Sequence, residues 1–313
     1  MHNQLFFKTI LMSAGLALLL PLPARSQPAQ PPHWQFDVPF VPTPYVVVEE
    51  MLRLARVTPE DFVMDLGSGD GRMLITAAKK IGASGIGVDL DGELVAESIE
   101  AAAAAGVSDR VKFLQQDLFK TDLGQATVIT MYLLPAVMMR LRPALLNLRP
   151  GTRLVSHDFR LEDWNPDATT QIRKNAFLWI VPAKVAGTWN MKFALPGADP
   201  SATVHTITLE LRQKFQEVDG IAHFDGRHAQ VWESRLSGDR LSFIIVDDRD
   251  RDNEAGLYFD GRVSGDVIEG RVRRGTGNAQ TVHDWRAERV KTGIISGAAA
   301  VRHVAVDSPI KER

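Results

Sequence analysis

The sequence contains no cysteine among its 313 residues. This absence excludes disulfides, thiol nucleophiles, and zinc or iron–sulfur sites that use cysteine ligands. Neither sign of charge dominates, since 36 Lys and Arg stand against 38 Asp and Glu. A protein that binds nucleic acid by general neutralisation of phosphates is therefore not expected. The hydrophobic content of 45% is that of a folded protein, and the length predicts about two domains.

Long hydrophobic runs are also scarce, and the one short run lies at the N-terminus. Lys8 precedes an apolar stretch from Ile10 to Leu20, and small residues around Ala24 and Ser26 follow it. This pattern predicts a signal peptide over residues 1–26, because the stretch is shorter than the roughly 20 residues of a membrane helix. A buried N-terminal helix is the alternative. Six prolines between Gln27 and Pro44 predict an extended linker over residues 27–44.

From Tyr45 onward, short apolar strands alternate with amphipathic helices. The expected strands are 62–66, 85–89, 111–115, 127–133 and 153–156, and the expected helices are 45–55, 72–81, 93–106 and 136–148. An antiparallel pair, 169–173 and 177–181 with a turn at 174–176, would complete the sheet. Repeated strand-then-helix units are typical of a doubly wound, Rossmann-like α/β sheet.

Acidic residues and glycines gather where the first three strands end. The first strand ends in Asp65-Leu-Gly67-Ser68-Gly69-Asp-Gly71, the second in Asp89 and the third at Asp117-Leu118. Glycines let a ligand approach the backbone closely, and Asp89 is placed to accept hydrogen bonds from ribose hydroxyls. Carboxylates at three strand ends suit a cationic adenosine ligand, and S-adenosylmethionine has that chemistry. The alternative is that these acids only cap helices.

These motifs resemble the class I, seven-strand S-adenosylmethionine-dependent methyltransferases over about Val41 to Ala183. The resemblance implies that the cofactor contacts Asp65, Gly67, Ser68, Gly69, Gly71, Asp89, Asp117 and Leu118. Three stretches are more narrowly similar to the small mitochondrial protein-lysine methyltransferases and their bacterial relatives. They are Phe40-Val41-Pro42, the Asp65–Arg72 loop and Trp164-x-Pro166. Protein lysine is the acceptor that this narrower resemblance implies.

The catalytic residues are less evident than the cofactor motif. The fourth strand lacks the Asn/Asp-Pro-Pro-aromatic motif of enzymes that methylate base amines, so a nucleic-acid acceptor is not expected. No paired acids near that strand suggest a metal. Tyr132 and Asp158, at the ends of the fourth and fifth strands, are weak candidates for orienting an acceptor amine, and a structural role is equally open. His157 is interpreted as structural. The helix that normally precedes the antiparallel pair is missing or very short, since only 161–167 is available for it.

After Pro182 the pattern changes to strict alternation, which predicts an all-β antiparallel barrel over residues 184–290 and a tail over 291–313. The eight expected strands are 185–194, 203–213, 217–224, 229–236, 240–247, 256–263, 267–274 and 281–290. The turn Leu236-Ser-Gly-Asp239 recurs as Val263-Ser-Gly-Asp266, and Gly187-Thr-Trp189 resembles the start of lipocalin-like barrels. Four scattered histidines (His205, His223, His228 and His283) are expected on the surface, with metal ligation as the alternative.

Two functions follow from this organisation. The first is a methyltransferase, which the signal peptide predicts to be exported, periplasmic or membrane-anchored, with membrane contact only through an uncleaved N-terminus. The second is an exported, non-catalytic protein whose lipocalin-like barrel holds a ligand. The cytoplasmic synthesis of S-adenosylmethionine favours the second function, or a cytoplasmic location for the first. The complete cofactor motif favours the methyltransferase.

Overall fold

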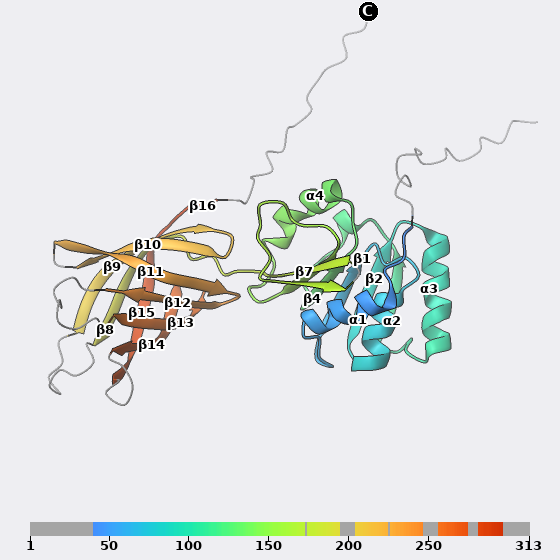
Figure 1. The fold of residues 1–313 in the computed structure, drawn as a ribbon, viewed down its shortest axis with the longest axis horizontal. Coiled ribbons are helices and arrows are strands. Elements are labelled where there is room, and N and C mark those ends of the chain that lie inside the picture. The colour runs from blue at the N-terminus through green and yellow to red at the C-terminus, as the bar shows by residue number, and fades with distance from the viewer. Residues whose placement is uncertain are drawn as a thin grey trace, which may run out of the picture. The chain divides into compact units, whose positions relative to one another are not determined.

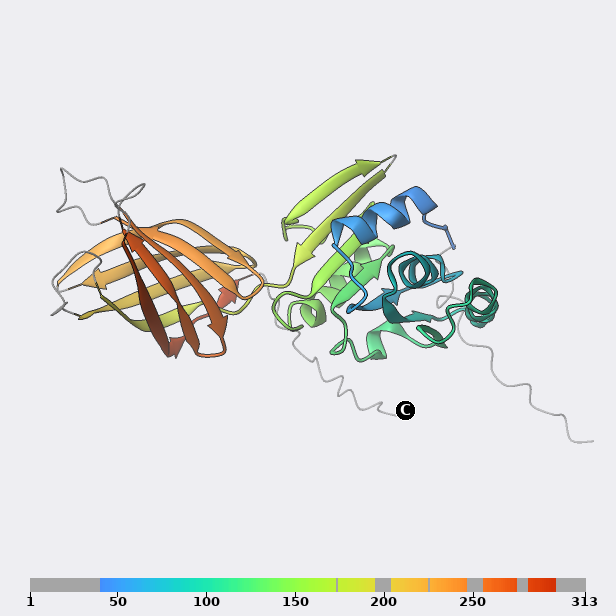
Figure 2. The same cartoon turned by 90° about the horizontal axis from the view of Figure 1, so that it is seen from below.

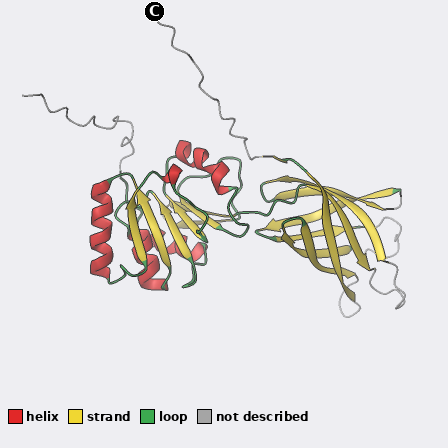
Figure 3. Ribbon diagram, turned by 180° about the vertical axis from the view of Figure 1, so that it is seen from behind, coloured by secondary structure: helices red, strands yellow, loops and turns green. Residues whose placement is uncertain are grey.

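The computed structural model describes residues 40–172, 174–194, 204–224, 226–246, 256–274 and 281–296. The predicted signal peptide, most of the linker, the charged stretch from Asp247 to Glu254 and the end of the tail lie outside these ranges. The described residues form two sheets, one accompanied by helices and one made of strands alone (Figures 1 and 3).

The first sheet has seven strands in the order β3-β2-β1-β4-β5-β7-β6, which confirms the doubly wound prediction. Its strands are β1 (Phe62–Leu66), β2 (Ser84–Asp89), β3 (Val111–Gln115), β4 (Val128–Met131), β5 (Arg153–His157), β6 (Ala168–Ile172) and β7 (Lys174–Ile180). β1 to β5 are parallel, and β7 runs antiparallel to β5 and β6. The predicted turn at 174–176 is wrong, because these residues begin β7 and pair with β6.

The helices are α1 (Tyr45–Leu54), α2 (Arg72–Ile81), α3 (Gly92–Ala105), α4 (Pro135–Leu145) and the short 3₁₀ helix η2 (Leu118–Lys120). Local sequence explains their ends: Asp91 caps the start of α3, Pro135 is the first residue of α4, and left-handed Gly82 and Gly106 end α2 and α3. Apolar residues of α1, α2 and α3 share one buried cluster with the sheet, and those of α4 share another.

The second sheet is an eight-strand antiparallel barrel, as predicted (Figure 2). Its strands are β8 (Gly187–Ala194), β9 (Val204–Lys214), β10 (Glu217–Phe224), β11 (Arg227–Ser237), β12 (Arg240–Ile245), β13 (Leu257–Ser264), β14 (Val267–Arg274) and β15 (Thr281–Thr292). Each strand pairs with the next, and β15 closes the barrel on β8. The sequence did not predict β16 (Ile295–Ser296), which pairs with β9.

Two recurring features of the barrel sequence have structural counterparts. The repeated Ser-Gly-Asp turns connect β11 to β12 and β13 to β14, and both of their glycines have a φ of +59°. Trp189 of the Gly-x-Trp sequence is fully buried, and its Nε1 donates to the carbonyl of Val185 over 2.9 Å. The Arg289 guanidinium lies 4.1 Å from the centre of the Trp189 ring.

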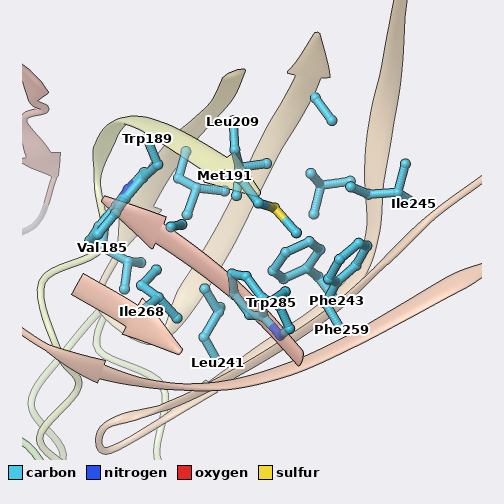
Figure 4. Close-up of a cluster of buried hydrophobic side chains, with 14 of the residues drawn as sticks. Val185, Trp189, Met191, Leu209, Leu241, Phe243, Ile245, Phe259, Ile268 and Trp285 are labelled. Atoms are coloured by element: carbon cyan, nitrogen blue, oxygen red, sulfur yellow. The ribbon is translucent and has the colours of Figure 1, made fainter. Parts of the chain in front are cut away.

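Apolar side chains from all eight strands fill the barrel (Figure 4). Phe243 stacks on Phe259 with ring centres 4.9 Å apart, and the Trp285 ring meets both edge-on. A filled interior does not support the alternative function, in which the barrel holds a ligand. A barrel of this strand number is just wide enough for its own side chains to fill.

The described residues lack both a membrane-spanning helix and a metal-binding cluster. No helix in the described ranges is long and apolar enough to cross a membrane. Among the same residues, no group of three or more His, Asp or Glu side chains is arranged to hold a metal ion. Two of the four scattered histidines have identified neighbours: His205 lies against Phe193, and His223 lies 3.8 Å from Glu210.

Candidate functional site

The glycine loop leads from the carboxyl end of β1 into α2. Gly67, Gly69 and Gly71 have φ values of +77°, +52° and +76°, a region that side chains other than glycine rarely adopt. The loop is anchored to β2, because the amides of Gly67 and Ser68 both donate to the carbonyl of Val88. At Gly71 a Cβ would lie 2.7 Å from the Phe113 ring, so the backbone has no room for a side chain there.

Asp89 joins the end of β2 to this loop. One carboxylate oxygen accepts from the amide of Gly69 over 2.8 Å, and the other accepts from the amide of Asp91 over 3.1 Å. Each carboxylate oxygen has a second lone pair, so these two bonds leave acceptor capacity for ligand hydroxyls. The structure therefore places Asp89 beside the predicted cofactor loop, where it also orders the loop backbone.

Asp65 is a buried acid at the end of β1. Its side chain accepts a 2.6 Å hydrogen bond from the Thr130 hydroxyl of β4. The pKa of Asp65 is raised to about 7, chiefly by burial and also by the neighbouring charges of Asp89 and Asp70, against the lowering effect of the Thr130 bond. Three acids thus place negative potential at this edge of the sheet. A cationic ligand would neutralise it.

The remaining predicted cofactor residues lie at the end of β3. Asp117 accepts from the amide of Phe119 over 2.9 Å and so caps η2, which is the capping role considered from the sequence. Its carboxylate also lies 3.8 Å from Lys120. Leu118 is partly buried against the apolar cluster that contains α4. The predicted contact of Asp117 and Leu118 with adenine stays a prediction.

Aromatic residues gather at the carboxyl ends of β4 and β5. The rings of Tyr132 and His157 have centres 4.1 Å apart, and Phe159 stacks on Tyr132 at 6.0 Å. The Thr43 hydroxyl lies 3.1 Å from Nδ1 of His157, and the Thr43 carbonyl accepts from Arg72 over 2.9 Å. Thr43, in the segment before α1, therefore connects His157 at the end of β5 with Arg72 at the start of α2.

Asp158, the second predicted catalytic candidate, lies in a tight turn between two of these aromatic residues. Its φ is +65°, and the amide of Phe159 donates to the carbonyl of His157 over 2.8 Å. A three-residue turn with positive φ at a residue other than glycine is strained. Strain of this kind is often found at functional sites, although Glu162 of the same segment also has a positive φ, of +51°.

The structure brings the residues singled out from the sequence into two groups. Asp89 bonds the glycine loop and lies near enough to Asp65 to raise its pKa, while Tyr132 contacts His157 and Phe159, the two residues that flank Asp158. Sequence reasoning missed Thr43. His157 was interpreted as structural, and its side chain is buried with 1% of its surface exposed; the structure adds its ring contact with Tyr132.

Comparison with known proteins identifies the family. The family model described as ANTKMT methyltransferase domain matches residues 65–168. A protein-lysine N-methyltransferase of Saccharolobus islandicus is 42% identical over 137 residues, which are 43% of this chain and 85% of the relative. The chain belongs to this family of S-adenosylmethionine-dependent methyltransferases. This membership overturns the alternative function, a non-catalytic binding protein.

Other relatives match the same part of the chain. A mouse lysine N-methyltransferase that is named for a subunit of ATP synthase is 37% identical over 42% of this chain and 53% of its own length. The mouse adenine nucleotide translocase lysine N-methyltransferase is 35% identical over 43% of this chain and 58% of its own length. A crystal structure described as an RNA methyltransferase from Salinibacter ruber with S-adenosyl-L-homocysteine has 48% identity and a TM-score of 0.46. It covers 46% of this chain and 96% of that one.

The site residues fit S-adenosylmethionine, the methyl donor of this family. The donor carries a sulfonium and an ammonium, which suit the carboxylates of Asp65 and Asp89 at the sheet edge, whereas the charge of Asp70 is paired with Arg72. The glycine loop and the start of α2 supply backbone amides close to the same edge. We therefore assign cofactor binding to Asp65, the glycine loop and Asp89 as a prediction of this geometry.

Replacing Asp89 with alanine is expected to weaken S-adenosylmethionine binding by roughly 1.5–3 kcal/mol, the range for hydrogen bonds to a charged group. This is about a 10- to 150-fold rise in Kd, measurable by calorimetric titration. The matched control is Asp91→Ala, because Asp91 caps α3 through the amides of Glu93 and Leu94 without contacting the loop. A change below about twofold for Asp89→Ala would show that this carboxylate only orders the backbone.

Cofactor affinity is expected to rise with pH through about 7, where Asp65 ionises. A cationic ligand binds the ionised form better, so Asp65→Asn should flatten the profile. Thr130→Val should move the transition to higher pH, since it removes the bond that lowers the pKa. The stability of the free protein should change in the opposite direction. An unfolded Asp ionises near pH 4, so the free energy of unfolding falls as pH rises from about 4 to 7.

Calorimetric titrations and urea unfolding of the wild type and both variants, between pH 5.5 and 8.5, measure these trends. An affinity profile of the wild type that Asp65→Asn leaves unchanged would contradict the role given to Asp65.

Proposed function

We propose that this chain methylates the ε-amino group of lysine in a protein acceptor. The relatives described as lysine N-methyltransferases support this acceptor. The chain spans little more than half the length of the two mouse enzymes, so their acceptors are not transferred to it. The proposal is limited to the chemical class of the acceptor.

The observation that carries the proposal is the carboxylate of Asp158 in its strained turn between His157 and Phe159. Both flanking rings contact Tyr132, at the end of the neighbouring strand. Asp158 brings a carboxylate into a turn whose two flanking residues are aromatic, and carboxylates and aromatic rings are the groups that recognise an alkylammonium, by a charged hydrogen bond and by cation–π contact. A flat base or a catechol would not need the carboxylate.

The protein residues have a limited set of tasks in such a reaction. S-adenosylmethionine supplies an electrophilic methyl group when bound, so the chain has to bind and align the amine. A lysine side chain has a pKa of about 10.4 and must lose a proton before its nitrogen can attack. Asp158 and the rings of Tyr132 and Phe159 bind and orient the ammonium form, and its proton leaves to solvent before the nitrogen attacks. Because the neutral amine is the nucleophile, the rate should rise with pH.

Methyl transfer to total protein and to total RNA from the source cells tests the acceptor class. The full chain is incubated with methyl-labelled S-adenosylmethionine and each fraction, and the hydrolysates are separated by chromatography and mass spectrometry. RNA is the contrasting fraction, because the fourth strand lacks the motif of enzymes that methylate base amines. We expect label in methylated lysine and none in methylated nucleosides. Label in nucleosides alone, or in neither fraction, would refute the proposal.

We further propose that residues 1–26 direct export, as the apolar run and its basic flank predict. The proposal is compatible with methylation only where the enzyme meets its cofactor, which is made in the cytoplasm. Fractionation of cells that express the full chain, with N-terminal sequencing of the product, measures both the location and the cleavage. Uncleaved protein in the cytoplasmic fraction would refute export.

A further inference from the structure

The turn between β9 and β10 of the barrel inserts a side chain into the core of the methyltransferase domain. Phe215 lies at the tip of this hairpin, where residues are normally exposed, yet only 2% of its surface is accessible. It packs in the apolar cluster that contains Leu141 of α4 and Trp179 of β7. Its φ is +54°, an uncommon conformation for a large residue, which indicates that the contact compensates for local strain.

The partner of Phe215 is Trp164, in the segment that connects β5 to β6. The two rings are nearly parallel, with centres 5.4 Å apart and 10° between their planes. Arg142 and Lys214 lie 5.7 and 6.0 Å from the centre of the Phe215 ring. Both cations also pair with Asp163 of the same segment, over 2.6 and 3.4 Å.

The next two residues of the hairpin add polar contacts to the same segment. Gln216 accepts from Nε1 of Trp164 over 2.8 Å and donates to the carbonyl of Asn165 over 2.6 Å. Glu217 accepts from the Asn165 side chain over 3.0 Å. Lys214 to Glu217 of the barrel therefore contact Asp163, Trp164 and Asn165 one after another.

These contacts hold residues 158–167, the segment that begins with the proposed acceptor-binding residues. Residues 158–167 start with Asp158 and Phe159 and end at β6, and no helix forms within them. Trp164 is their fully buried anchor. Its carbonyl accepts from Nε1 of Trp179 over 2.7 Å, while its ring and its own Nε1 meet the barrel turn. A segment without helix or strand depends on such outside contacts for its position, and at Trp164 they come from Trp179 and from the barrel turn.

We propose that the β9–β10 turn is a positioning element for methyl transfer, with Phe215 and Gln216 holding residues 158–167 so that Asp158 and Phe159 align the acceptor amine. The expected loss of methyl transfer rests on the proposed function. The turn gives the barrel a role in catalysis that does not require the barrel to bind substrate. The cofactor loop and Asp89 lie at the ends of β1 and β2, and none of the hairpin contacts described above reaches them. Alignment of the acceptor should therefore depend on the turn, and cofactor binding should not.

The test compares Phe215→Ala and Gln216→Ala with the matched control Phe224→Ala in the full chain. Phe224 is at the other end of β10 and packs on the barrel core, so its replacement removes the same atoms from the same hairpin. Gln216→Ala removes two hydrogen bonds and no apolar packing, which guards against misfolding of Phe215→Ala. For each variant we measure hydrogen exchange and the cofactor Kd. We also measure how the rate of methyl-lysine formation depends on the concentration of total protein.

We expect faster hydrogen exchange in residues 158–167 for both turn variants and unchanged exchange in the glycine loop. The kcat/KM for the protein fraction should fall at least tenfold, while the Kd for S-adenosylmethionine stays within twofold and Phe224→Ala matches the wild type. Unchanged exchange in 158–167 overturns the inference, as does a cofactor Kd that rises in parallel with the loss of activity. If the wild type forms no methyl-lysine, the proposed function fails, and hydrogen exchange alone decides whether the turn positions the segment.

Discussion

Replacing Gly69 with valine is expected to abolish S-adenosylmethionine binding, with a rise in Kd of more than about 100-fold. Gly69 has a φ of +52°, where a β-branched residue is a severe outlier, and its amide donates to Asp89. A valine would move the backbone of the loop and break that bond. It would also place a side chain where the Phe40 ring now lies against the loop. Calorimetric titration of the folded variant measures the loss.

The matched control for this experiment is Gly106→Val. Gly106 has a similar φ of +71°, but it ends α3, and no atom beyond its chain neighbours and its own helix backbone lies within 4 Å of the position that a Cβ would take there. This variant should lose stability through backbone strain and keep its cofactor affinity. Unchanged affinity in a folded Gly69→Val protein would refute the assignment of the loop as the cofactor site.

Removing the carboxylate of Asp158 is expected to lower kcat/KM for protein lysine by about 30- to 150-fold, the effect of losing a charged hydrogen bond of roughly 2–3 kcal/mol. Two substitutions separate the carboxylate from the turn. Asp158→Ala removes the carboxylate and leaves a side chain at a φ of +65°, whereas Asp158→Gly removes the carboxylate and relieves the strain. Initial rates of methyl-lysine formation provide the measurement.

If the carboxylate aligns the amine, both variants lose activity to a similar degree, and Asp158→Gly unfolds at the same or a higher urea concentration than the wild type. Their cofactor affinity should stay within about twofold, because the cofactor contacts assigned above lie on other strands. Full activity in Asp158→Gly would mean that Asp158 serves the turn alone. The acceptor would then have to be oriented by Tyr132 or His157.

Much of the fold follows from local patterns in the chain. The predicted ranges of β1, α2 and β3 agree with the structure residue for residue, since each is a short apolar or amphipathic segment bounded by glycine or polar turns. All eight barrel strands were also expected within a few residues, because strict alternation is unambiguous when turn residues recur at short intervals. The boundary between β6 and β7 was misplaced, since Lys174-Asn175-Ala176 has the composition of a turn but pairs in register with β6.

The sequence also predicted the division into two domains. It did not predict that the β9–β10 turn of the second domain contacts the core of the first. The change of pattern at Pro182 also predicts that residues 27–183 and 184–290 fold independently, and this stays a prediction. A cut at Ala183 would remove Phe215 from the core of the first domain and leave Trp164 without its stacking partner. Nothing in the sequence around Lys214 and Phe215 marks this turn, because a phenylalanine at a hairpin is as compatible with barrel packing as with insertion into a neighbour.

The sequence by itself determined the class of cofactor and predicted where in the fold it binds. A run of glycines and acids within seven residues is a local feature, and strand ends in a parallel sheet meet at one edge whatever the details of packing. Only the tertiary structure brought together the residues of the proposed acceptor side, where Thr43, Tyr132, His157 and Asp158 come from three separate segments. The same holds for Phe215, which lies 51 positions from Trp164 in the chain. Contacts between distant segments depend on how the sheets and loops pack, and periodicity carries no information about that.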